Sequence, residues 1–281
     1  TPLSKVFVNI LIPAMVLNKF LLKFNLDLLK RYWSIPLYSL GFIGFSLLAG
    51  SFIAKRLKHE HKHEFVAMLS FTNSGYIVLP MILELFKGES QEMAIIMNFL
   101  FTMLFMLLMW SLGIYLVTGT ATKLKLKKLP MPFVITLVAM GLGMLNLKDH
   151  IPQPVFTTLH IVGLVGVYGA MVILGGILSQ LGKLNFTHII KNLRFVFIKN
   201  ILFPAVFILF IYLMRMAPLK AVVLSLVTIT PPANNLAIIT QRYASSVDSK
   251  QFVYSSIFAS YMSALITIPV FMLILRLLYG I

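Results

Sequence analysis

The segment Thr228-Ile229-Thr230-Pro231-Pro232-Ala233-Asn234-Asn235 places two consecutive prolines in the middle of a long apolar stretch. Inside a helix, each proline removes a backbone donor and clashes with the preceding turn, at a cost of about 3 kcal/mol or more. The residue before a proline is also biased away from helical geometry. This segment therefore predicts a helix that is interrupted near its centre.

A second stretch has the same character: Phe71-Thr72-Asn73-Ser74-Gly75-Tyr76-Ile77-Val78-Leu79-Pro80. In hydrocarbon, the carbonyl and amide groups freed by an interruption need partners. Asn, Ser and Thr side chains supply some of them, and the rest must face a polar cavity or neighbouring protein. One proline-containing span favours a simple kink. Two interruptions, each flanked by asparagine, favour a functional site.

The composition places the chain in a membrane. It has 281 residues, of which 59% are hydrophobic and 11% charged, whereas a soluble domain carries about 25% charged residues. The formal net charge is +16. Because the basic residues lie in short gaps between apolar runs, we interpret them as contacts to the lipid surface and set nucleic acid aside. The absence of cysteine excludes a thiolate metal site and a cysteine nucleophile.

The apolar runs predict an all-α polytopic membrane protein. A membrane-spanning helix needs about 20 apolar residues. Nine stretches approach or exceed that length, which are 6–22, 32–54, 65–83, 93–122, 129–147, 151–182, 194–215, 221–241 and 251–275.

The loops predict an orientation. Fourteen basic residues fall on one side of the predicted spans and nine on the other, and the richer side is expected to be cytoplasmic. The basic connector 119–129 lies on that side. We therefore expect a multi-pass protein of the plasma membrane, with this connector inside and the C-terminus outside.

The connector also divides the predicted spans into four and five. Many transporters consist of inverted repeats, and the two interrupted spans, 65–83 and 221–241, run in opposite senses as the second-to-last span of each half. We expect them to cross near the bilayer midplane. A further helix upstream of Thr1 would complete an arrangement of five plus five.

The predicted crossing suits a charged solute. The N-terminus of a half-helix presents free N–H groups and a positive dipole end that hold a carboxylate, and its C-terminus presents carbonyls that hold a cation. The candidate substrate-binding residues are Asn73, Ser74, Gly75, Pro80, Pro231, Pro232, Asn234 and Asn235.

Several motifs along the chain support a family resemblance. They are Leu3-Ser4-Lys5 through Asn9 with Pro13-Ala14, Asn73-Ser74-Gly75 with Leu79-Pro80, Leu174-Gly175, Pro204, the run from Pro231 through Asn235 to Arg242-Tyr243, and Ile268-Pro269. With these motifs the chain resembles the auxin efflux carrier family, which includes plant auxin carriers and bacterial transporters for malate or malonate. The resemblance covers almost the whole chain.

The resemblance implies ten helices in two inverted repeats, with crossed and broken fourth and ninth helices around the substrate. It also implies a scaffold part, often dimeric, and a transporter part that moves against it. Carried over to this chain, the scaffold comprises 1–32 and 130–193, the transporter part comprises 33–118 and 194–281, and 119–129 is the connector.

A few ionisable residues lie within or beside the predicted spans. Lys199 is expected to snorkel towards the cytoplasmic surface, with attraction of an anion as the alternative. Glu84 is expected at the interface, paired with Lys87, with proton transport as the alternative. The run His59, His61 and His63 favours a short basic loop over a metal site.

We therefore predict a secondary transporter that moves small organic anions, such as malate, malonate or auxin-like acids, by alternating access. No nucleophile elbow, phosphate loop or carboxylate pair suggests an enzyme, and no cofactor or metal is expected. The expected partners are the anion, the bilayer and a second copy bound through the scaffold. The alternatives are a sodium- or proton-coupled carrier of another solute on the same architecture, and a membrane sensor that does not transport.

Overall fold

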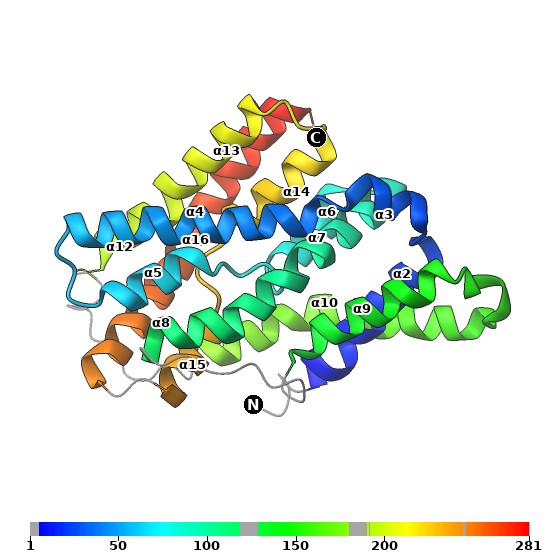
Figure 1. The fold of residues 1–281 in the computed structure, drawn as a ribbon, viewed down its shortest axis with the longest axis horizontal. Helices are drawn as coiled ribbons and strands as arrows, with labels where there is room; N and C mark the ends of the chain where they lie inside the picture. Colours follow the sequence, from blue (N-terminus) through cyan, green and yellow to red (C-terminus); the bar gives the residue numbers. More distant parts are fainter. Residues whose placement is uncertain (1–5, 119–128, 180–189, 191, 244–245, 281) are drawn as a thin grey trace. The chain divides into compact units, whose positions relative to one another are not determined.

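The computed structural model describes residues 6–118, 129–179, 190, 192–243 and 246–280 (Figure 1). Across these ranges the secondary structure is helical, and β-pairing is confined to one isolated antiparallel bridge between Thr72 and Pro232. The predicted connector 119–129 lies outside the described residues except for Leu129.

Four of the described helical segments are long and apolar enough to cross a membrane, and they are Leu26–Arg56, Gly88–Val117, Leu193–Leu213 and Val247–Tyr279. Large apolar side chains lie exposed along them, with Leu48, Leu265 and Leu277 each more than 70% exposed. Such surfaces are stable against lipid rather than water. The predicted all-α membrane class is confirmed, whereas the count of nine spans and the inverted repeat stay predictions.

The chain forms two compact units. The first contains 1–41, 75–110 and 123–176, and the second contains 42–74, 111–122 and 177–281. Within the described residues, the chain passes between them inside three helical segments and at the link from Ser74 to Gly75. The predicted scaffold and transporter parts are a functional division, which stays a prediction.

The first unit is organised around α2, which packs against α7 and α9. Close helix contacts depend on small residues in α10. A Cβ added to Gly163 would lie 2.9 Å from the Met15 Cα, and one added to Gly166 would lie 2.8 Å from the Leu11 Cβ. The helices of this unit are η1 (Phe7–Leu11, a π-helix), α2 (Ile12–Lys23), α3 (Leu26–Tyr32), α6 (Val78–Leu85), α7 (Gly88–Leu108), α9 (Met131–Met144), η4 (Leu147–His150, a 3-10 helix) and α10 (Gln153–Leu178).

The second unit is organised around α16, which contacts α5, α12, η5, α14 and α15 (Figure 1). Its elements are most of α4 (Ile35–Arg56), α5 (Lys62–Ser70), η2 (Met109–Gly113, a π-helix), α8 (Ile114–Thr118), α12 (Leu193–Phe197), η5 (Ile198–Leu202, a π-helix), α13 (Phe203–Leu213), α14 (Pro218–Thr228), α15 (Asn235–Tyr243) and α16 (Val247–Tyr279). Helices α5 and α14 are each followed by a non-helical stretch. Because α5 comes from the first half of the sequence and α14 from the second, this unit contains parts of both halves.

Candidate functional site

The two non-helical stretches of the second unit pair with each other through their backbones. The Asn73 N–H donates to the Pro231 carbonyl over 2.9 Å, and the Ala233 N–H donates to the Phe71 carbonyl over 2.8 Å. These bonds flank the bridge between Thr72 and Pro232. Backbone groups that would be costly in hydrocarbon therefore satisfy each other where the stretches meet. We call residues 71–73 and 231–233 the crossing.

A tyrosine from α16 joins both sides of the crossing. The Asn73 Nδ2 donates to the Tyr261 hydroxyl over 2.5 Å, and that hydroxyl donates to the Pro232 carbonyl over 3.2 Å. Asn73 and Tyr261 are both buried. The hydroxyl thereby fixes one side chain of the first stretch against the backbone of the second.

Helix α15 begins directly after the crossing. Asn234 precedes its first residue and is 1% exposed, and Asn235 is that first residue and is half-buried. The Asn234 Nδ2 is buried and has no hydrogen-bond partner among the described residues. A buried donor at the positive end of a helix is well placed to meet an acceptor with negative charge.

Further buried polar atoms of the second unit lack partners within the described part of the chain. A buried polar group without a partner costs about 1–3 kcal/mol, so a group of them indicates water or a polar solute. Besides the Asn234 Nδ2, they include the hydroxyls of Ser70 at the end of α5, Thr72 in the crossing, Ser225 in α14, and Ser256 and Ser260 in α16.

Gly75 and Pro80 belong to the first unit. The non-helical stretch after α5 runs from Phe71 to Ile77 and contains no proline, because Pro80 is the third residue of α6. The first backbone N–H groups of a helix have no partner within it, so a proline is tolerated there. Asn73, Ser74, Pro231, Pro232, Asn234 and Asn235 all lie in the second unit.

The structure corrects the interpretation of Lys199. This residue lies in η5 and is fully buried, so it does not snorkel to the surface. Its Nζ donates to the Leu69 carbonyl in the last turn of α5 over 3.1 Å and lies 5.8 Å from the centre of the Phe203 ring. Among the described residues it has no carboxylate partner.

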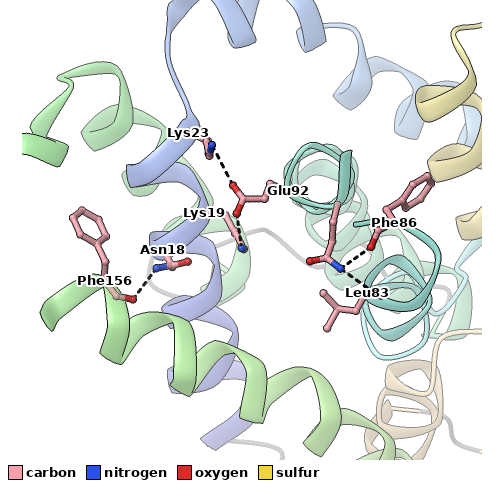
Figure 2. A network of polar contacts seen from close by, with 8 residues as sticks. Asn18, Lys19, Lys23, Leu83, Phe86, Glu92 and Phe156 are labelled. Atoms are coloured by element: carbon pink, nitrogen blue, oxygen red, sulfur yellow. Dashed lines mark hydrogen bonds and ion pairs between the residues drawn. The ribbon is translucent and has the colours of Figure 1, made fainter. Parts of the chain in front are cut away.

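The ion pair predicted between Glu84 and Lys87 also differs from what the structure shows. Glu84 is exposed, but the Lys87 Nζ donates to the Leu83 carbonyl instead of pairing with it. Figure 2 shows ion pairs that do form in the first unit. The Glu92 carboxylate pairs with the Lys19 Nζ at 3.3 Å and with the Lys23 Nζ at 3.8 Å. These ions belong to α2 and α7 and hold the two helices together.

The histidine run packs against aromatic rings. His59 and His61 both lie against Phe252, with ring centres 4.8 and 5.0 Å apart, and His59 also contacts Phe65. Burial lowers the pKa of His59 from its ordinary value, with a further contribution from neighbouring His61. The described residues contain no group of three or more side chains suited to hold a metal ion.

Sequence reasoning missed Tyr261 and the burial of Lys199. A signal for the tyrosine was available, because Ser255, Ser256 and Ser260 give span 251–275 a polar stripe at helical spacing beside it. No local pattern indicated the lysine contact, since its partner is a backbone carbonyl 130 residues away in the sequence.

Comparison with known proteins identifies the class. The family model described as "Membrane transport protein" matches residues 1–272. No curated protein and no solved structure gives a significant match.

Proposed function

Because the chain belongs to the membrane transport protein family, the auxin efflux carrier family that its motifs resemble, we propose that it is a secondary transporter of small organic anions. The anion binds beside the crossing and is carried across the bilayer by alternating access. Carboxylates such as malate, malonate or auxin-like acids are the substrate class.

The observation that supports this proposal is the pairing of two non-helical stretches, each of which follows a helix, in a buried and polar environment. The backbone bonds of the crossing join Asn73 to Pro231 and Ala233 to Phe71. Around them lie hydroxyl and amide groups without partners among the described residues, such as those of Thr72 and Asn234. Transporter binding sites of this kind lie where discontinuous helices expose backbone polarity inside the membrane.

The chemistry of these groups favours an anion. The amide of Asn234 offers a buried donor at the N-terminus of α15, where the helix dipole is positive. Asn, Ser and Thr side chains can bind a carboxylate although they are neutral. When no substrate is bound, they therefore leave no charged side chain buried in hydrocarbon. In the second unit, the described carboxylates are Glu60, Glu64 and Asp248, none of which belongs to the crossing.

Uptake and efflux of labelled malate, malonate and indole acetate by proteoliposomes test the proposal. The double variant Asn73→Ala with Asn235→Ala removes one polar side chain of the crossing and one at the start of α15. Because a hydrogen bond to a charged group contributes about 1.5–3 kcal/mol, we expect flux at subsaturating substrate to fall at least about tenfold.

The matched control is Asn18→Ala. Asn18 is also buried, but its Nδ2 donates to the Phe156 carbonyl in the first unit over 2.9 Å. This variant should fold less stably and keep the substrate affinity of the wild type. Flux that survives the double variant at the crossing would contradict the proposed site. Binding of the anion without any flux would instead favour a sensor.

A further inference from the structure

The ammonium of Lys199 lies at the carbonyl end of α5, beside the crossing. Its Nζ donates over 3.1 Å to the carbonyl of Leu69, which precedes Ser70, the last residue of that helix. Its side chain extends from η5, a π-helical segment, and is completely shielded from solvent. Short π-helical segments occur frequently at functional sites.

The position that this ammonium occupies is one that attracts cations. The last four carbonyl groups of a helix have no partner within it, and the helix dipole gives that end about half a negative charge. At the end of α5, the Ala67 carbonyl accepts from the Phe71 N–H, and the Leu69 carbonyl accepts from Lys199. In transporters with interrupted helices, such carbonyl ends bind Na⁺.

The charge of Lys199 is not explained by an ion pair. The ion pairs among the described residues join Lys19 and Lys23 to Glu92, all in the first unit. In the second unit, Glu60 lies before α5, Glu64 lies in its first turn and Asp248 in the first turn of α16. A buried charge without a counter-ion is costly, so the carbonyl end of α5 is the group that compensates it.

We propose that Lys199 is a tethered cation, whose ammonium takes the place of a free monovalent cation at the end of α5. That end of α5 is thereby neutralised by a group of the chain itself, and anion transport does not require Na⁺. This inference deepens the proposed function, because it assigns the coupling of the same site.

The test compares two variants in Na⁺ and in choline at equal ionic strength, using the purified full-length chain. Lys199→Ser removes the charge and leaves space for a cation with water, whereas Lys199→Met fills most of that space without charge. We expect Na⁺ to raise the melting temperature of Lys199→Ser progressively with concentration, as mass action requires for a bound ligand. Lys199→Met is expected to lose stability equally in both salts.

Flux gives the second readout. In proteoliposomes, Na⁺ should increase anion flux by Lys199→Ser at least about fivefold, the lower end of typical coupling between sites. The wild type should transport equally in Na⁺ and in choline. Lys19→Met is the matched control, because that lysine is also buried but has Glu92 as its partner. Its stability and flux should not depend on the cation.

Three results would overturn the inference. Wild-type stability or flux that rises with Na⁺ would show that a free cation is still needed, and this measurement does not depend on any variant folding. If neither the melting temperature nor the flux of Lys199→Ser responds to Na⁺, the role of Lys199 is structural only. If Lys199→Ser raises the KM for the anion and shows no cation effect, the charge of Lys199 acts on the substrate and not on the end of α5. If the wild type shows no flux at all, the proposed function fails, while the melting temperatures still decide the role of Lys199.

Discussion

The two non-helical stretches that meet at the crossing, which we call the first and second interruption, follow helices that end by different means. The first, Phe71–Ile77, contains no proline, and the preceding helix α5 ends against Lys199, which comes from the other half of the sequence. The second, Ile229–Asn234, contains two prolines. The helix before it, α14, is closed by its own neighbours, because the hydroxyls of Thr228 and Thr230 donate to the Ser225 and Val227 carbonyls over 2.8 Å each.

The difference shows that equivalent geometry can be encoded locally or at a distance. The second interruption follows from residues within it and directly before it, since prolines prevent a helix from continuing and threonines satisfy the freed carbonyls. The first follows from tertiary structure, since its carbonyl end depends on an ammonium supplied by η5. Variants that act on one interruption, on both or on neither can distinguish an interruption set by local sequence from one set by a tertiary contact.

The largest effect is expected where one group acts on both interruptions. Tyr261→Phe removes the hydroxyl that accepts from the Asn73 Nδ2 and donates to the Pro232 carbonyl. Because a buried polar group that loses its partner costs about 1–3 kcal/mol, we expect the free energy of unfolding to fall by about 2 kcal/mol or more, and anion flux with it. Thermal or denaturant unfolding of the purified protein measures the loss.

Tyr254→Phe is the control for this variant. Tyr254 lies on the same helix, is half-buried, and makes no hydrogen bond among those seen in the described residues. Its loss should change stability by less than about 0.5 kcal/mol. If both tyrosine variants behave alike, the hydroxyl of Tyr261 does not join the two interruptions.

A smaller effect is expected at the second interruption alone. The double variant Thr228→Val with Thr230→Val keeps the side-chain shape but removes both hydroxyls that close α14. Because a typical hydrogen bond contributes about 0.5–1.5 kcal/mol, the free energy of unfolding should fall by about 1–3 kcal/mol in total. The loss should be the same in Na⁺ and in choline, unlike that of Lys199→Ser. A stability that recovers in Na⁺ would show that both interruptions end at cation sites.

The same contrast explains what the sequence predicts and what it does not. The membrane class and the family follow from composition and motifs, because long apolar runs have few alternatives and are read without tertiary information. Proline pairs and asparagines likewise indicate where helical structure stops. These signals are local, so they remain visible in a single sequence.

The partners of the buried polar groups could not be predicted in this way. Lys199 suggests a snorkelling residue because its position near a span end is typical of one, and only the fold shows that the Leu69 carbonyl lies opposite. Glu92 and Lys19 are 73 residues apart in sequence, whereas Lys87 is a nearer partner for Glu84 and does not pair with it. Sequence proximity favoured the wrong pair, because helix packing brings distant ions together.

The smallest effect is expected at Gly75, within the first interruption. A Cβ added there would meet no atom within 4 Å, and the backbone of this residue does not have a positive φ. Since alanine restricts the unfolded chain more than glycine does, Gly75→Ala should leave stability unchanged or raise it by about 0.4–1 kcal/mol. If the first interruption depends on Lys199 and not on glycine, the melting temperature and the anion flux of this variant will both stay at or above those of the wild type. A loss of either would show that the first interruption also carries a local requirement, and the contrast with the second would disappear.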